Sequence, residues 1–324
     1  METSRSTLTI DDFEILRTIG TGTFGRVKLA KLYGNQKMPP FALKILRKKL
    51  IIKYKQVDHV KSEKETLSKI NHPFIVKCFL SFQDESFIYF LFEYIPGGEL
   101  FTLLRHIVRF PAENVRFYSS QLVLALEYLH NKDIIYRDIK PENILIDRKG
   151  YLKLTDFGFA KIVKGKAYTM CGTPEYMAPE VIMKGAGYDL TADWWSFGVF
   201  LFEMIEGQPP FFDDNPIQIY QKIVSGKYSF QYCPSIKLKN LIKKLLQDPE
   251  KRIGRKNGAK DIRTHDFFSK VNWVDTLNKH ILAPWVPVVE SRDDTQYFGV
   301  YVDTDEATPS VTGSVDMNTI FQGF

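Results

Sequence analysis

Cysteine is scarce in this sequence: three residues, Cys78, Cys171 and Cys233, are spread over 324 positions. They are odd in number and form no C-x-x-C pair or Cys/His cluster, which argues against a disulfide framework and a structural zinc site. Unpaired cysteines are typical of proteins from a reducing compartment. We therefore expect the protein to act inside the cell, in the cytoplasm and also in the nucleus.

Long apolar runs are also missing. The most apolar stretch, residues 194–205, contains Glu203 and is too short to span a bilayer, so it predicts a buried helix and no membrane insertion. The polar N-terminus shows no signal peptide and no glycine for myristoylation. The net charge of +6 is too small to predict nucleic-acid binding. Residues 284–324 carry a net −6, which indicates an acidic tail on a basic body.

The patterning divides the chain into four segments: a short N-terminal extension (1–12), a strand-rich part (13–95), a helix-rich part (96–283) and a tail (284–324). Short apolar runs predict strands at 13–19, 27–30, 41–46 and 87–92. Helical periodicity predicts helices near 58–70, 113–131, 191–206, 216–225 and 237–247. The predicted fold class is α+β, with a β-rich small lobe, a mostly helical large lobe and a C-terminal tail.

Gly20, Gly22 and Gly25 form a G-x-G-x-x-G pattern between two predicted strands. A dinucleotide-binding fold would continue from such a loop into a helix, whereas a loop between strands favours a lid over nucleotide phosphates. A plain hairpin turn is the alternative. Lys44 interrupts the next apolar strand, and Glu63 on the following helix is a candidate partner for it. Such a pair would fix a cation at the phosphates, although a strand lysine often simply faces solvent.

Two further segments carry chemistry: YRDIKPEN at 136–143 and DFG at 156–158. Together with the glycine loop, Lys44 and Glu63, in this order and spacing, they resemble the eukaryotic protein kinase family. The resemblance implies a bilobal kinase fold, phosphoryl transfer, ATP and Mg²⁺ as cofactors, and a catalytic Lys44–Glu63 pair. The family usually has histidine at the position of Tyr136, and tyrosine is typical of its cyclic-nucleotide-linked branch.

The chemistry of the matching residues fits these roles. Asp138 is suited to accept the proton of an attacking hydroxyl. Lys140 can neutralise the transferring phosphoryl group. Asn143 and Asp156 offer the hard oxygen ligands that Mg²⁺ prefers. Each residue taken singly also fits an ordinary turn, so it is their joint order that predicts the site.

A narrower resemblance covers residues 11–324. The segment 209–226 and the final FQGF at 321–324 are similar to AGC-type kinases, in particular to catalytic subunits of cyclic AMP-dependent protein kinase. This implies a serine/threonine kinase whose substrates carry basic residues upstream of the phosphoacceptor. It also implies activation by phosphorylation at Thr169, control in trans by a cyclic-nucleotide-binding regulatory subunit, and pseudosubstrate inhibitors as further partners.

The same resemblance names the remaining site residues. The ATP-binding set is Ile19, Gly20, Gly22, Gly25, Val27, Ala42, Lys44, Glu93, Ile95, Leu145 and Thr155. Three glutamates, taken as surface residues, would read substrate arginines: Glu99, Glu142 and Glu203. An apolar pocket for the residue after the phosphoacceptor would consist of Met170, Pro174 and Met177. Two tail residues, Phe298 and Tyr301, would cover the nucleotide pocket.

Two alternatives are weighed against this prediction. A cyclic GMP-dependent kinase usually carries its sensor domains on the same chain, and the twelve residues before Phe13 are too few to encode one. A catalytically dead scaffold would be expected to have lost Lys44, Asp138 or Asp156, and all three are present. The tail also holds four hydroxyl residues, none of which aligns clearly with the family's tail phosphorylation site: Thr308, Ser310, Thr312 and Ser314.

Overall fold

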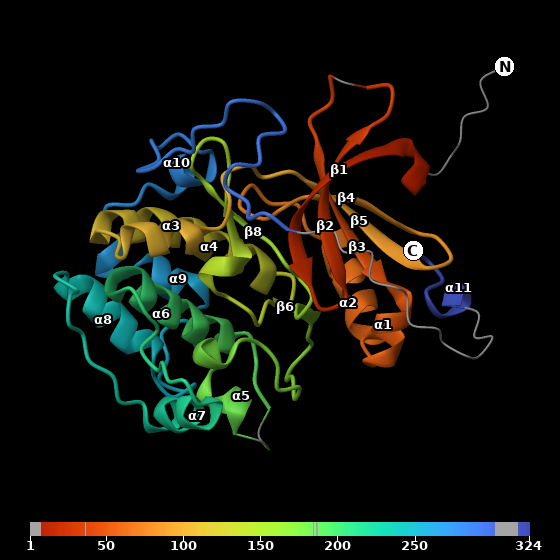
Figure 1. The fold of residues 1–324 in the computed structure, drawn as a ribbon. Coiled ribbons are helices and arrows are strands. Elements are labelled where there is room, and N and C mark those ends of the chain that lie inside the picture. Colours follow the sequence, from red (N-terminus) through yellow and green to blue (C-terminus); the bar gives the residue numbers. More distant parts are fainter. Residues whose placement is uncertain (1–7, 36, 184, 186, 302–316) are drawn as a thin grey trace.

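The computed structural model of the chain describes residues 8–35, 37–183, 185, 187–301 and 317–324. They form a sheet-rich small lobe and a helical large lobe (Figure 1). The four hydroxyl residues considered as tail phosphorylation sites, Thr308, Ser310, Thr312 and Ser314, lie outside the described residues. The division of the chain at residues 13, 96 and 284 stays a prediction of domain boundaries.

The small lobe is a five-stranded antiparallel sheet with strand order β1-β2-β3-β5-β4. Its strands are β1 (Phe13–Gly22), β2 (Gly25–Leu32), β3 (Phe41–Arg47), β4 (Cys78–Gln83) and β5 (Phe87–Glu93). Two helices, α1 (Lys48–Lys53) and α2 (Val57–Ser68), follow β3. In the sheet, Leu43 pairs with Leu91, and both belong to an apolar cluster on one face. Because side chains alternate, the next pair, Lys44 and Phe90, turns to the opposite face, where α2 lies.

The large lobe is built mainly from helices. They are α3 (Leu100–Ile107), α4 (Ala112–His130), α5 (Pro179–Ile182), α6 (Thr191–Glu206), α7 (Pro216–Ser225), α8 (Ile236–Leu245), α9 (Ala259–Arg263) and α10 (Trp273–Leu277). Four short strands pair as β6 (Ile134–Ile135) with β9 (Lys161–Ile162), and β7 (Ile144–Ile146) with β8 (Leu152–Leu154). No helix in the described ranges has the length and apolar character needed to cross a membrane.

Helix α6 lies at the centre of the large lobe. All 16 of its residues are buried, including Trp194 and Trp195, which pack in the core as predicted. Gly207, with φ at 91°, ends the helix in the left-handed conformation that glycine adopts without strain. The predicted helices at 191–206 and 216–225 are confirmed to the residue. The other three begin one residue earlier than predicted and end one or two residues earlier.

One buried ion pair and one buried carboxylate support the segments around the cleft between the lobes. Arg252 is fully buried and pairs with Glu180 at 2.5 Å. The Asp193 carboxylate accepts hydrogen bonds from the backbone N–H groups of Tyr136 and Arg137, at 2.9 and 2.8 Å. Asp193 therefore braces the loop that carries the YRD segment.

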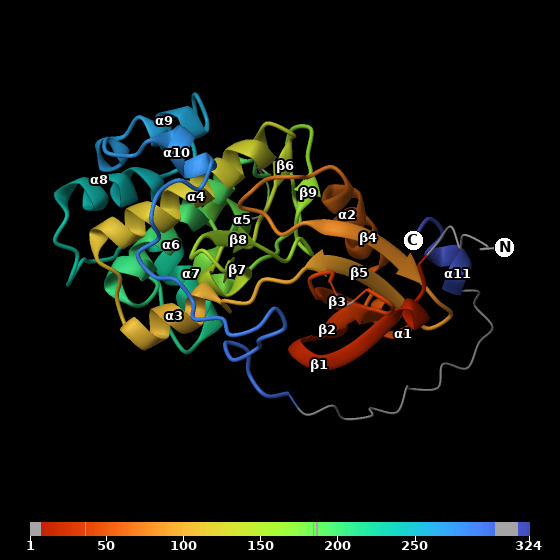
Figure 2. The same cartoon turned by 90° about the horizontal axis from the view of Figure 1, so that it is seen from above.

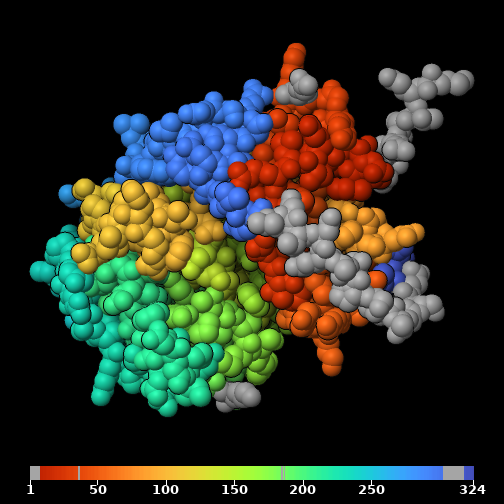
Figure 3. All heavy atoms as spheres, viewed as in Figure 1, coloured from red at the N-terminus to blue at the C-terminus, as the bar shows by residue number. Residues whose placement is uncertain are grey.

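The C-terminal tail returns to the small lobe. Helix α11 (Met317–Ile320) lies beside α1 and β4 (Figure 2), and the Phe321 ring that follows it is fully buried. Lys48, also fully buried, donates to the Asn318 side chain at 2.7 Å. Earlier in the tail, Asp293 pairs with Lys31 of β2 at 2.6 Å, which fits the predicted acidic tail on a basic body. On the face shown in Figure 3, described tail atoms lie over the large lobe and reach the edge of the small lobe.

Candidate active site

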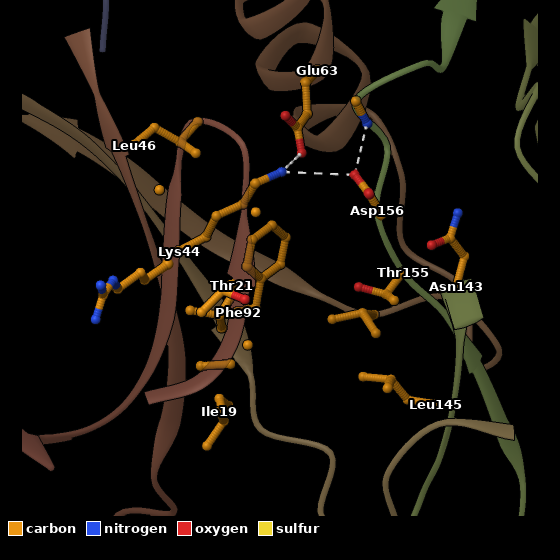
Figure 4. Close-up of a pocket in the computed structure, with 18 of the residues that line it drawn as sticks. Ile19, Thr21, Lys44, Leu46, Glu63, Phe92, Asn143, Leu145, Thr155 and Asp156 are labelled. Atoms are coloured by element: carbon orange, nitrogen blue, oxygen red, sulfur yellow. Dashed lines mark hydrogen bonds and ion pairs between the residues drawn. The ribbon is translucent and has the colours of Figure 1, made fainter. Parts of the chain in front are cut away.

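A cleft of about 560 Å³ lies between the lobes. The β1–β2 loop, β3 and α2 line it from the small lobe, and β7 and the segment after β8 line it from the large lobe (Figure 4). Every predicted ATP-binding residue lines this cleft: Ile19, Gly20, Gly22, Gly25, Val27, Ala42, Lys44, Glu93, Ile95, Leu145 and Thr155. Its volume lies within the range of small-molecule sites. The lining residues, from Ile19 to Thr155, thus come together in the cleft although they are far apart in the sequence.

An ion pair crosses the back of the cleft. The Lys44 Nζ atom lies 2.6 Å from Glu63 Oε1 of α2 and 3.7 Å from Asp156 Oδ1 (Figure 4). Burial disfavours the Lys44 ammonium, but Glu63 and Asp156 more than offset this and raise the lysine pKa. Lys44 is therefore a fixed positive charge, and a solvent-facing lysine is excluded because its side chain is only 20% exposed.

The glycine loop contains two kinds of glycine. A Cβ on Gly25 would lie 1.8 Å from the Ile45 carbonyl oxygen, so packing against β3 requires glycine there. Gly20 and Gly22 have room for a Cβ, with nearest neighbours at 3.6 and 4.0 Å, and neither has a φ in the left-handed range. The fold itself thus explains Gly25 but not the other two glycines.

Asp138 is buried in a closed hydrogen-bond network. Its Oδ1 accepts from the Thr173 N–H at 3.1 Å and the Thr173 hydroxyl at 2.7 Å. Its Oδ2 accepts from Asn143 at 2.7 Å and lies 3.0 Å from the Lys140 Nζ. Lys140 also donates to Thr173 at 2.8 Å. The network holds the carboxylate in one orientation, and Thr173 is a member that the sequence motifs did not single out.

Asn143 and Asp156 both line the cleft. The Asn143 side-chain nitrogen donates both to the backbone oxygen and to the Oδ2 atom of Asp138. The side-chain oxygen of Asn143 is left to bind a cation. Asp156 has φ at 54°, an unusual conformation that aspartate tolerates, and its side chain is 51% exposed. Its neighbour Phe157 is buried against the Tyr136 ring and anchors this turn. The two oxygen donors fit a hard cation such as Mg²⁺.

The apolar end of the cleft contains residues that the resemblance did not name. Phe92, at the end of β5, and Val76 line it together with the predicted residues. The Glu93 carboxylate is bonded to Lys153 at 2.5 Å and to the Lys77 N–H at 2.8 Å. The Glu93 Oε1 atom is therefore engaged within the protein.

Three carboxylates gather beside the cleft. Glu99 and Glu142 line it, and burial raises the pKa of both, with Glu142 adding to the effect on Glu99. Of the two expectations for Glu203, a position in a buried helix is confirmed and a surface position is wrong, because its side chain is 1% exposed within α6. Arg105 and the Tyr176 hydroxyl both donate to its carboxylate. Burial raises the Glu203 pKa to about 7, while Arg105 opposes the shift.

The segment around Thr169 lies outside the cleft. Thr169 is exposed, and its carbonyl accepts a hydrogen bond from Tyr188 at 2.6 Å. Arg137 donates to that Tyr188 hydroxyl at 3.1 Å. Of the three predicted apolar-pocket residues, Met170 is exposed, Pro174 begins a short 3₁₀ helix, and Met177 is buried. A pocket formed by these three residues stays a prediction.

Comparison with known proteins places the chain in a family. Residues 13–268 match the protein kinase domain. The chain is 46% identical over 317 residues to the human cAMP-dependent protein kinase catalytic subunit PRKX, covering 97% of this chain and 87% of that protein. It is 45% identical over 295 residues to cAMP-dependent protein kinase type 3 of Saccharomyces cerevisiae, covering 90% and 73%.

A third relative is the cAMP-dependent protein kinase catalytic subunit 3 of Drosophila melanogaster, which is 46% identical over 298 residues. The match covers 91% of this chain and 51% of that protein, so the chain spans about half the length of this relative. The two-lobed fold is accordingly the bilobal protein kinase fold. The chain belongs to the protein kinase family and is an ATP-dependent serine/threonine kinase, similar over most of its length to cAMP-dependent catalytic subunits.

Proposed function

We propose that the chain transfers the γ-phosphoryl group of Mg-ATP to serine or threonine residues that follow basic residues, under control in trans by a cyclic-nucleotide-binding regulatory subunit. The substrate preference rests on the cluster of three carboxylates beside the cleft, those of Glu99, Glu142 and Glu203. The buried Oε2 atom of Glu142 accepts no hydrogen bond from any described residue. An unsatisfied buried acceptor is unfavourable by about 1–3 kcal/mol, and a substrate guanidinium would satisfy it.

The residues of the cleft would divide the chemistry among them. Gly20 and Gly22 lack side chains that the fold would allow, which would let phosphate oxygens approach the loop backbone closely. Lys44, held by Glu63, would bind the nucleotide phosphates. Asn143 and Asp156 would hold Mg²⁺, which when bound supplies charge neutralisation at the phosphates.

Proton transfer would involve Asp138. Its two oxygens are oriented by Thr173, Asn143 and Lys140, so the carboxylate is held ready to accept the proton of the substrate hydroxyl. Lys140 carries a positive charge next to the reacting group, where it would stabilise the charge that develops on the transferred phosphoryl oxygens. The pre-set orientation is what lets these groups act without rearranging.

Activation at Thr169 is supported by the contacts beneath it. A phosphate on Thr169 would bring about −2 charge and needs cations. Arg137 reaches Tyr188, which in turn bonds the Thr169 carbonyl, and Arg137 directly precedes Asp138. A phosphate held by Arg137 would therefore stabilise the loop that carries the catalytic carboxylate. The regulatory partner would contact the exposed apolar side chains of Tyr168 and Met170, and action in the cytoplasm and nucleus stays a prediction.

Replacing Asp156 tests the metal role. Asparagine keeps the size of the side chain, tolerates the positive φ and can still accept the Gly158 N–H, but it lacks the charge that holds Mg²⁺. We expect Asp156→Asn to lower kcat about a thousandfold while the unfolding free energy stays within about 1 kcal/mol. Steady-state kinetics and urea unfolding measure the two effects, with exposed Asp58→Asn as control. Near wild-type turnover by Asp156→Asn would refute the metal role.

The proposed function is tested with Thr169-phosphorylated protein and two peptides, Arg-Arg-x-Ser and Ala-Ala-x-Ser. We expect kcat/KM to be about a hundredfold higher for the arginine peptide, because two charge-assisted contacts are lost with alanine. Glu142→Gln should reduce this preference about tenfold, and the exposed Glu250→Gln should not. A regulatory subunit of a cAMP-dependent kinase should suppress turnover until cAMP is added. Nucleotide binding without turnover would instead support the scaffold alternative.

The raised pKa of Glu203 predicts a pH-dependent substrate preference. The carboxyl is ionised above its pKa of about 7 and neutral below it, and only the ionised form can bind a substrate arginine in place of Arg105. Between pH 8 and pH 6 we expect KM for the Arg-Arg-x-Ser peptide to rise about tenfold. KM for Ala-Ala-x-Ser should change little, and Glu203→Gln should remove the pH dependence. Identical pH profiles for both peptides would contradict a role for Glu203.

A further inference from the structure

Arg17 of β1 donates two hydrogen bonds to the C-terminal tail. Its Nη1 atom donates to the Thr295 hydroxyl at 2.9 Å, and its Nη2 atom donates to the Gly299 carbonyl at 2.8 Å. The planar guanidinium presents its donors in a fixed fork, so both bonds come from one rigid group. Arg17 therefore holds both ends of the short tail segment 295–299.

Phe298 lies inside this segment and lines the cleft. Its ring centroid is 5.8 Å from that of Tyr94, and the Tyr94 hydroxyl donates to the Asp294 carbonyl at 2.5 Å. Ile19, two residues after Arg17 on β1, also lines the cleft. Arg17 thus ties the strand that carries Ile19 to the tail that carries Phe298.

The tail before and within this segment is attached to both lobes by other contacts. Asp293 pairs with Lys31 of the small lobe at 2.6 Å, and Arg148 of the large lobe donates to the Ser291 carbonyl at 2.6 Å. Tyr297 packs closely on Gly98, where a Cβ would lie 2.8 Å from the Tyr297 carbonyl oxygen. Loss of Arg17 would therefore leave the tail docked up to Tyr297 and loosen the residues that follow. Phe298 would keep its N–H bond to the Thr295 carbonyl at 2.9 Å and its ring contact with Tyr94.

We propose that Arg17 is a positioning residue for nucleotide binding, which acts by holding Phe298 against the mouth of the cleft. The inference rests on the proposed binding of ATP in that cleft. A ring that is already ordered loses little conformational freedom when the nucleotide binds, whereas a loosened segment must first be ordered. Arg17 acts through Phe298 and touches neither the phosphates nor the substrate hydroxyl, so it affects nucleotide affinity rather than the chemical step.

The test compares Arg17→Ala, Arg17→Lys and Lys61→Ala, an exposed charge-matched control on α2. Calorimetry measures the affinity for a nonhydrolysable Mg-ATP analogue, and kinetics measure kcat and both KM values. We expect Arg17→Ala to raise the analogue Kd and KM for ATP about tenfold, with kcat and peptide KM within about twofold. Arg17→Lys, which offers a single ammonium for the two acceptors, should show about a threefold effect.

A double-mutant cycle with Phe298→Ala identifies the route of the effect. If Arg17 acts through Phe298, Arg17→Ala should raise Kd by less than about twofold in the Phe298→Ala background. Unchanged Kd in Arg17→Ala, full additivity in the cycle, or a loss in kcat instead of affinity would each overturn the inference. Failure of the unmodified protein to bind the analogue would overturn the proposed nucleotide site itself, so the two failures are distinguishable.

Discussion

The ion pair between Lys44 and Glu63 is the contact on which the architecture of the cleft depends. It joins a strand of the sheet to α2 at 2.6 Å, and Asp156 of the large lobe approaches the same ammonium at 3.7 Å. Three elements from different parts of the chain therefore share one positive charge. Burial alone would lower the pKa of Lys44, so its charge persists because two carboxylates face it. A shift of α2 would remove Glu63 and change the charge balance of the whole site.

The site combines polar groups that are satisfied with polar groups that are not. The Asp138 carboxylate is bonded on both oxygens, which fixes its orientation. Glu142, by contrast, has a buried oxygen without a described donor. Glu203 is satisfied within the chain by Arg105 and Tyr176. Buried groups in proteins are normally paired, so an unpaired carboxylate beside a cleft indicates a place for an external cation. This contrast separates the catalytic group from the groups that select the substrate.

Prediction from the sequence succeeds where a short stretch of sequence carries the signal. Helices α6 and α7 are predicted to the residue because Gly207 and Gly226 mark their ends and the apolar pattern is continuous. The nucleotide-binding residues could be named because the order of the motifs resembles the kinase family, and this resemblance assigns the residues around them. Thr173 could not, because its contact with Asp138 joins positions 35 residues apart and a lone threonine has no pattern.

The contacts of Glu203 and Arg17 could not be predicted either, because they depend on residues far away in the sequence. Glutamate is usually exposed, and only the packing of α6 reveals that Glu203 is buried against Arg105. Arg17 lies in a strand where arginine normally faces solvent, and its partners on the tail lie 278 and 282 residues away. The short strands β6 to β9 have two or three residues each, too few to show a periodicity.

The central claim is that residues from both lobes converge on one triphosphate. A crystal structure of the protein with Mg²⁺ and a nonhydrolysable ATP analogue tests this most directly. The account predicts phosphate oxygens within hydrogen-bonding distance of the Lys44 Nζ atom, the metal bound by Asp156 and Asn143, and the base among Ile19, Val27, Ala42 and Leu145. An analogue bound outside this cleft, or one whose phosphates leave Lys44 and Asp156 uncontacted, would contradict it.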